Sequence, residues 1–117
     1  MQTTSYRLPL SDQAELLVWF VTERAVISYS VVLVARHQDA WHTIRVYDNA
    51  HGHNELHRHT ASAGKQPAEA FLPGDFGEAM RAARAEVLVG YEKIIGSSTI
   101  WVGQAITGPA FSLATMR

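Results

Sequence analysis

The sequence contains no cysteine, which excludes disulfides and thiolate metal sites. No apolar run approaches the roughly 20 residues that a transmembrane helix needs, and the first residues lack the apolar core of a signal peptide. There is no glycine-rich phosphate loop, no serine in a nucleophile-elbow context and no internal repeat. We therefore expect a cytoplasmic protein that does not associate with a membrane.

An excess of charge of one sign is also lacking, since the formal net charge is −1. Non-specific nucleic-acid binders are usually basic, because phosphate contacts supply most of their affinity. The balance argues against a dedicated DNA-binding module, but it allows an enzyme that touches RNA through a small local patch. A chain of 117 residues predicts one domain, with a core over about 14–96 and a tail over 97–117.

Apolar stretches rich in β-branched residues predict strands over 14–22, 25–36 and 41–48, and a short fourth strand over 55–60. Residues 1–13 have few apolar positions, so we expect a loosely held arm there. In the second strand, alternation predicts one apolar face made of Ile27, Tyr29, Val31, Leu33 and Ala35. In the third strand it predicts Ile44 and Val46 on one face, opposite Trp41, Thr43, Arg45 and Tyr47.

A helix over 75–95 is the clearest local pattern. Asp75 is a suitable N-cap, and Glu78 follows three residues later, as in a capping box. Gly96 is a natural C-terminal stop. An apolar stripe runs along the helix through Phe76, Met80, Ala83, Val87, Tyr91 and Ile94.

These elements predict an α+β fold, in which an antiparallel meander of three to four strands packs against one long C-terminal helix. A loop over 61–73 connects the sheet to the helix. Residues 97–102 are compatible with a late strand, and residues 107–113 with a tail packed on the body or on another chain.

Histidines are concentrated in one stretch, since five of the six lie within residues 41–60. Four of them follow the spacing H-x-H-x3-H-x-H: His51, His53, His57 and His59. On a strand, His57 and His59 project to the same side. If the protein does chemistry, we expect it here. His37 and His42, outside this cluster, we interpret as structural.

Three interpretations of the cluster stay open. It can bind a metal such as Zn²⁺ through His57 and His59, with His51, His53 or Asp48 completing the set. It can instead work without metal, with His57 and His59 as an acid–base pair, because an imidazole exchanges protons near neutral pH. It can also be a polar turn without chemistry. We prefer the metal-free pair, because no complete ligand signature is visible.

In the metal-free mechanism, the substrate is RNA, which carries its own nucleophile in the 2′-hydroxyl. Asp48 orients a histidine, and His53 belongs to the catalytic set. Arg45 and Arg58 contact the phosphate, whose cleavage needs positive charge nearby.

One stretch of the sequence resembles the TumE-like family of bacterial toxin–antitoxin systems. It consists of Val46-Tyr47-Asp48-Asn49-Ala50, a histidine-rich turn and then His57-Arg58-His59. The resemblance covers about residues 25–95 and is most specific over the Tyr-Asp-Asn-Ala stretch. It carries over Tyr47, Asp48, Asn49, His57 and His59, and it makes Tyr47 and Asn49 candidates for substrate binding. The segment after Gly96 departs from the family pattern.

The resemblance implies a cytoplasmic toxin that a cognate antitoxin neutralises, commonly one with a helix-turn-helix. The leading hypothesis is therefore a toxin-like ribonuclease with a histidine-based site and no cofactor. The alternatives are a non-enzymatic partner-binding protein and a small metal-dependent enzyme with Zn²⁺ as the cofactor. A homodimer is compatible with each of them.

Overall fold

A meandering β-sheet and one α-helix make up the part of the chain that the computed structural model describes, residues 1–60 and 63–98. The order of the elements along the chain is β1 (Gln2–Ser11), β2 (Ala14–Glu23), β3 (Ala25–His37), β4 (Ala40–Asp48), β5 (Glu55–Thr60), β6 (Gly64–Lys65), β7 (Glu69–Ala70) and α1 (Phe76–Ser98).

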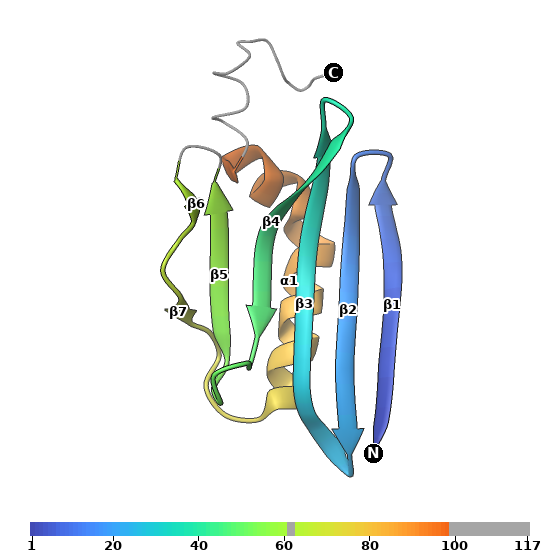
Figure 1. Cartoon of the computed structure of the whole chain (residues 1–117), viewed down its shortest axis with the longest axis vertical. Helices are drawn as coiled ribbons and strands as arrows, with labels where there is room; N and C mark the ends of the chain where they lie inside the picture. The colour runs from blue at the N-terminus through green and yellow to red at the C-terminus, as the bar shows by residue number, and fades with distance from the viewer. Residues whose placement is uncertain (61–62, 99–117) are drawn as a thin grey trace.

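The strands form one antiparallel sheet in the order β1-β2-β3-β4-β5-β6, and the short β7 also pairs with β5. The helix α1 packs on one face of this sheet (Figure 1). The predicted α+β class and the meander are therefore confirmed. The sheet has seven strands, however, and not three or four, because β1 joins one edge while β6 and β7 form within the predicted loop over 61–73.

The prediction of a loosely held arm over 1–13 was wrong. β1 pairs with β2 along nearly its whole length, and its side chains alternate between the two faces of the sheet. On the helix side, Arg84 donates from Nε to the Tyr6 hydroxyl at 2.9 Å, and the Tyr91 hydroxyl donates to the carbonyl of Leu10 at 3.1 Å. The strand has few apolar residues because only one of its faces is covered.

The core lies between the sheet and α1. The face predicted for β3 is confirmed for Tyr29, Val31, Leu33 and Ala35, all of which are buried. Ile27, near the start of the strand, is 43% exposed, because it is an extra residue where the register with β2 shifts. The buried residues of the neighbouring strands are Leu16, Val18, Ile44, Tyr47 and Leu56, and those of the helix include Ala79, Met80, Ala83 and Val87.

A bulge in β4 overturns the predicted faces of that strand. Leu33 pairs with Arg45 but Val34 pairs with Thr43, so Ile44 is an extra residue in the ladder. Beyond the bulge the alternation is shifted by one, and Tyr47 is buried on the helix side while Val46 lies on the opposite face. Strict alternation misses an inserted residue of this kind.

The helix begins as predicted, since the Glu78 amide donates to Oδ2 of Asp75 at 2.8 Å. Gly90 has non-helical dihedral angles (φ −122°, ψ 15°) and kinks α1. Gly96 does not end the helix, which continues to Ser98. The predicted strand over 97–102 is therefore wrong for its first two residues, and its remainder lies outside the described residues, as does the tail over 107–113.

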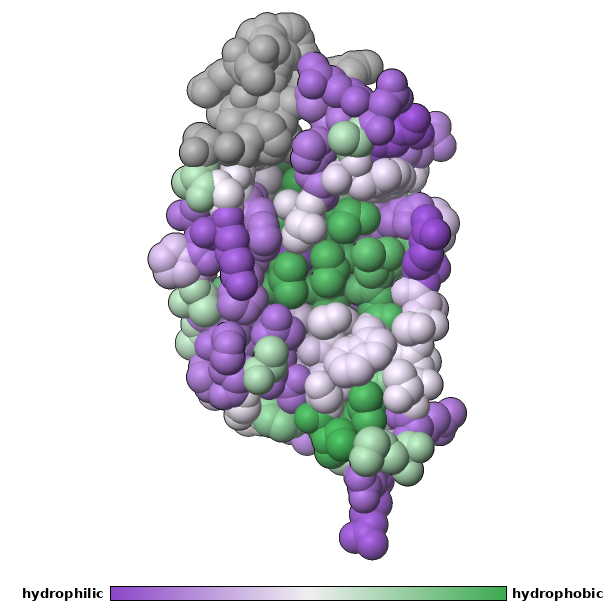
Figure 2. All heavy atoms as spheres, viewed as in Figure 1, coloured by the Kyte–Doolittle hydropathy of each residue, from purple (hydrophilic) through white to green (hydrophobic). Residues whose placement is uncertain are grey.

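The sheet face opposite α1 has no described element packed on it, and Figure 2 shows this face. A row of side chains that pair across neighbouring strands runs over it: Arg7, Leu17, Val32, Val46 and His57. We call this surface the open face; its middle is apolar (Figure 2). Among the described residues, no helix has the length and apolar character that crossing a membrane requires.

Candidate functional site

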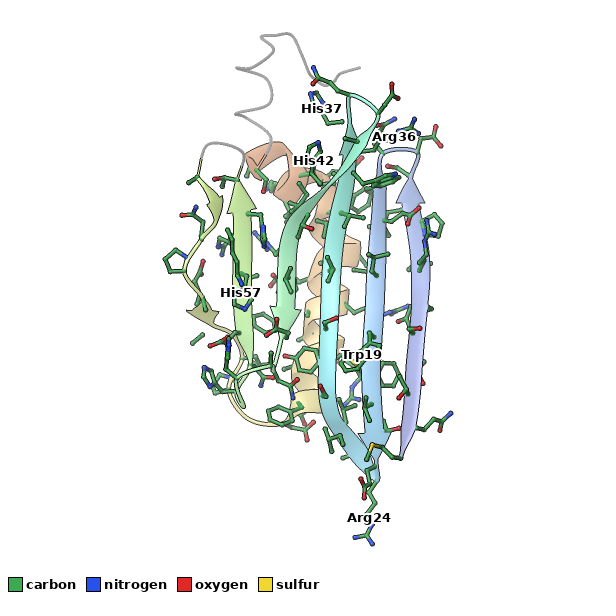
Figure 3. All side chains as sticks on the ribbon, in the orientation of Figure 1. Trp19, Arg24, Arg36, His37, His42 and His57 are labelled. Carbon is green, nitrogen blue, oxygen red and sulfur yellow. The ribbon has the colours of Figure 1, made fainter. Side chains whose placement is uncertain are left out.

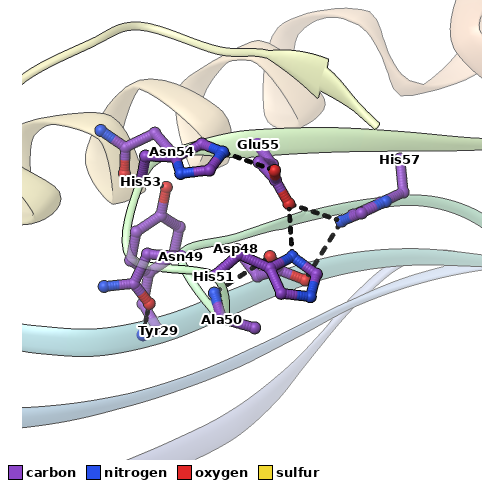
Figure 4. Close-up of polar contacts among 9 residues, drawn as sticks. All are labelled: Tyr29, Asp48, Asn49, Ala50, His51, His53, Asn54, Glu55 and His57. Atoms are coloured by element: carbon purple, nitrogen blue, oxygen red, sulfur yellow. Dashed lines mark hydrogen bonds and ion pairs between the residues drawn. The ribbon is translucent and has the colours of Figure 1, made fainter. Parts of the chain in front are cut away.

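The turn between β4 and β5 presents a group of histidines and carboxylates at the edge of the open face (Figure 4). β4 ends at Asp48 and β5 begins at Glu55, and these two residues pair with each other across the ladder. Gly52, at φ +87°, lets the connecting chain reverse, and its amide donates to the carbonyl of Asn49 at 2.9 Å. We call Asp48, His51, His53, Glu55 and His57 the turn cluster.

Glu55 is the centre of the turn cluster. Although it is only 8% exposed, its carboxylate lies 2.9 Å from Nδ1 of His51 and 2.6 Å from Nε2 of His53. The side chains of these two histidines are 69% and 65% exposed. One buried carboxylate therefore holds two imidazoles that remain accessible to a substrate.

His57 lies beneath them and is 4% exposed. Its Nε2 is 3.6 Å from Oδ2 of Asp48 and 3.5 Å from Oε1 of Glu55. Its Nδ1 is buried and has no hydrogen-bond partner within the described part of the chain. The imidazole is therefore enclosed and turned toward two carboxylates without a short hydrogen bond on either nitrogen.

The contacts in the turn cluster shift its proton affinities. The hydrogen bond from His51, followed in size by burial in the opposite sense, holds the pKa of the Glu55 carboxyl below its ordinary value. The same hydrogen bond raises the pKa of His51. Outside the turn cluster, burial, with smaller contributions from Lys65 and His57, lowers the pKa of His59. The charged carboxylate is thus the favoured form of Glu55.

Buried carboxamides hold this turn in place from below. Asn49 accepts from the Tyr29 amide at 2.9 Å and donates to the Ile27 carbonyl at 3.1 Å. Asn54 accepts from the Tyr29 hydroxyl at 2.7 Å and donates to the Leu72 carbonyl at 2.9 Å. Asn49, predicted to bind substrate, is therefore turned into the protein, where it ties the turn to β3.

Three other predicted substrate contacts lie on the wrong side of the sheet. Arg45, Tyr47 and Arg58 are on the face that α1 covers, opposite the turn cluster. Arg45 pairs with Glu86 of the helix at 3.2 Å, and the Tyr47 hydroxyl donates to the same carboxylate. Arg58 pairs with Glu69 at 2.6 Å. The β4 bulge is the physical reason that Arg45 and Tyr47 lie on the face covered by α1.

The remaining histidines are outside the turn cluster. His59 is on the same face as His57, as predicted, but it pairs with Lys65 of β6 and is two residues farther along β5. Figure 3 shows His37 and His42 toward the other end of the sheet. The structure thus brings Asp48, His53 and His57 together and leaves His59 beside them.

Sequence reasoning missed Glu55 and Asn54. A signal for Glu55 was present, because it precedes His57 by two residues on a predicted strand and must share its face. Asn54 carried no such signal, since its partners are Tyr29, Leu72 and Gly74, far away in the sequence.

The open face continues from the turn cluster toward Trp19, which is 38% exposed. Trp19 pairs with Ser30, Ser30 with Asp48, and Asp48 with Glu55. Two strand spacings of about 4.8 Å each therefore separate Trp19 from Asp48, with a small serine between them.

Among the comparisons with known proteins, the one with family profiles gave a match. A comparison with curated proteins and one with solved structures each gave no match. The sequence profile described as "Domain of unknown function (DUF7718)" matches residues 1–94, which include every strand, the turn cluster and most of α1. The chain therefore belongs to the DUF7718 family.

Proposed function

We propose that this protein is a toxin-like enzyme that cleaves RNA at the turn cluster. The observation that carries the proposal is the pair of contacts from Glu55 to His51 and His53. A carboxylate that orients an imidazole is a recurrent device for moving protons during bond cleavage. Here the carboxylate is enclosed, while both imidazoles face outward.

His51 and His53 are the residues that reach the substrate. RNA carries its own nucleophile in the 2′-hydroxyl, so cleavage needs groups that accept and donate protons near the phosphate. His57 is a poorer candidate for direct contact than the sequence suggested, because only 4% of it is exposed. We assign His57 and Asp48 to the interior of the site, and the two outer histidines to the contact with RNA.

The open face offers room for the RNA chain. Trp19 is exposed two strands away from Asp48, and an indole on a sheet surface stacks with a nucleobase of any sequence. Lys65 of β6 pairs with His59 of β5, so the two side chains lie on the same face of the sheet. Lys65 is exposed and can contact a backbone phosphate. The resemblance to the TumE-like family favours the same class of substrate.

The test is expression of the full chain in bacteria without a partner, followed by measurement of growth and RNA integrity. We expect slowed growth and RNA fragmentation with the wild type, and relief of both with His51→Ala combined with His53→Ala. The matched control is His37→Ala combined with His42→Ala, which removes the same number of imidazoles from the far end of the β3–β4 hairpin. Normal growth with intact RNA at a verified soluble level of wild-type protein would overturn the proposal.

A further inference from the structure

The turn cluster contains a donor set suited to a metal ion. Oxygen atoms of Asp48 and Glu55 and a ring nitrogen of His57 all lie within 4.8 Å of one another. We infer that these three side chains bind one divalent transition-metal cation. The inference deepens the proposed function, on whose site it rests, by naming the cofactor of that site.

The distances from Nε2 of His57 fit a shared ion better than hydrogen bonds. They are 3.6 Å to Asp48 Oδ2 and 3.5 Å to Glu55 Oε1, longer than the 2.7–3.2 Å or so of an N–H···O bond. Two donors bound to one Zn²⁺ at about 2.0–2.2 Å, in tetrahedral directions, lie roughly 3.3–3.6 Å apart. His57 is therefore already near the separation from each carboxylate that a bound ion imposes, and the two carboxylates, within 4.8 Å of each other, need only a small adjustment.

The enclosed ring of His57 is an independent observation that points to a ligand. Its side chain is 6% exposed, and Nδ1 has no partner among the described residues. A buried imidazole normally gains at least one good hydrogen bond, which this ring lacks. A cation at Nε2 gives the ring a strong interaction on the nitrogen that faces the two carboxylates, and it fixes the proton on Nδ1. Because no acceptor within residues 1–60 and 63–98 orients the ring from the Nδ1 side, we expect weaker binding than at a structural zinc site.

The charge of the turn cluster calls for a cation as well. Asp48 and Glu55 lie close together, with side chains 17% and 10% exposed. No lysine or arginine of the described segments forms an ion pair with either carboxylate. Two such carboxylates repel an RNA phosphate, and a cation bound between them reduces this repulsion.

The donor types select the kind of ion. One imidazole nitrogen and two carboxylate oxygens, with no thiolate, suit Zn²⁺ or Mn²⁺, whereas Mg²⁺ prefers oxygen ligands alone. Such an ion acts as a Lewis acid on a phosphoryl oxygen when it is bound. His51 and His53 remain on the outer side of Glu55, where they meet the substrate.

The test measures metal directly and without RNA. The full chain, purified without a histidine tag and stripped with a chelator, is titrated with Zn²⁺ and separately with Mn²⁺, and bound metal is counted by elemental analysis after gel filtration. We expect one ion per chain for at least one of the two metals, and at least about a tenfold loss of affinity in Asp48→Asn and His57→Gln. The matched controls are Asp12→Asn, in the exposed turn between β1 and β2, and His42→Gln, at the far end of the β3–β4 hairpin, and both should bind like the wild type.

Asp48→Asn is the decisive variant, because His57→Gln alters a buried ring and can unfold the protein. The amide oxygen of an asparagine can still accept the hydrogen bond that Asp48 receives from the Ala50 amide, so the turn should persist, which circular dichroism checks. Absence of bound metal in the wild type would overturn the inference. Binding that survives Asp48→Asn but is lost in His51→Ala with His53→Ala would also overturn it, as binding by surface histidines only.

The two proposals fail in distinguishable ways. Metal that is bound at Asp48 without any RNA cleavage leaves the metal site standing and removes the proposed function. Cleavage by wild-type protein that takes up neither Zn²⁺ nor Mn²⁺ in the titration removes the metal site and leaves the proposed function standing.

Discussion

The hydroxyl of Tyr29 donates a 2.7 Å hydrogen bond to Oδ1 of Asn54, which is 25 residues later in the chain. Tyr29 belongs to the core of the sheet, and Asn54 is the last residue of the turn that carries His51 and His53. Both residues are buried. The contact therefore fixes the end of this turn to the core strand β3.

Tyr29→Phe should destabilise the protein by roughly 1–3 kcal/mol, because it leaves a buried amide oxygen without its donor. Denaturant unfolding gives this number, and hydrogen exchange of the Gly52 amide, inside the turn, should become faster. The matched control is Tyr6→Phe, where the hydroxyl accepts from Arg84 at the surface, with an expected change within about 0.5 kcal/mol. Equal effects of the two variants would show that Asn54 is not held by Tyr29.

Asn49→Ala should act on stability rather than on substrate contact. It removes the acceptor of the Tyr29 amide and the donor to the Ile27 carbonyl, and the buried unpaired amide alone costs about 1–3 kcal/mol. The free energy of unfolding measures this effect, with Gln13→Ala in the exposed β1–β2 turn as the control. A variant of full stability that has lost only RNA binding would restore the substrate role predicted from the sequence.

Met80→Asp should be severely destabilising, by roughly 3–5 kcal/mol, because it places an unpaired charge in the core. Met80 is 9% exposed at the interface of α1 with the sheet, whereas Val89 on the same helix is 90% exposed. Val89→Asp introduces the same charge into the same helix and should change stability by no more than about 0.5 kcal/mol. Thermal unfolding of the pair tests which face of α1 packs, and similar melting temperatures would contradict the assignment.

Stability should fall at alkaline pH through Tyr47. Burial, and next the hydrogen bond to Glu86, raise the pKa of Tyr47 from 10.0 to about 12. The folded state therefore keeps a proton that the unfolded chain releases. The contribution is fully present below pH 10.0 and is lost as the pH rises to about 12.

Tyr47→Phe removes this ionisation, so the advantage in unfolding free energy of the wild type over the variant should shrink across that range, by up to about 3 kcal/mol. Denaturant unfolding of both proteins at each pH gives the difference, and any titration common to the two cancels. A difference that stays constant with pH would mean that Tyr47 does not ionise differently in the folded and unfolded states.

Local sequence determined the elements whose causes are local. The N-cap at Asp75 and the apolar stripe that includes Met80 and Val87 defined the helix, because capping and a period of 3.6 residues depend on near neighbours. Alternation defined the buried face of β3 from Tyr29 to Ala35 for the same reason. The histidine spacing likewise located the candidate site at the β4–β5 turn.

Tertiary structure decided which side chains of that stretch meet. The bulge at Ile44 turned Arg45 and Tyr47 toward α1. The bulge is visible only in how β4 pairs with β3, so the local sequence pattern of β4 does not predict it. β1 became a strand because Leu8 and Leu10 face a helix that lies some 80 residues away in the chain, with the Leu10 carbonyl accepting from Tyr91.

Glu55 shows the same division. It stands two residues before His57 on a predicted strand, so the sequence alone determines that both side chains lie on the same face. Its role as the carboxylate that His51, His53 and His57 share depends on how the turn folds back over β5. That path is set by contacts of Asn49 and Asn54 with the distant Tyr29. Side-chain direction is a local property of a strand, whereas proximity between strands is a property of the whole fold.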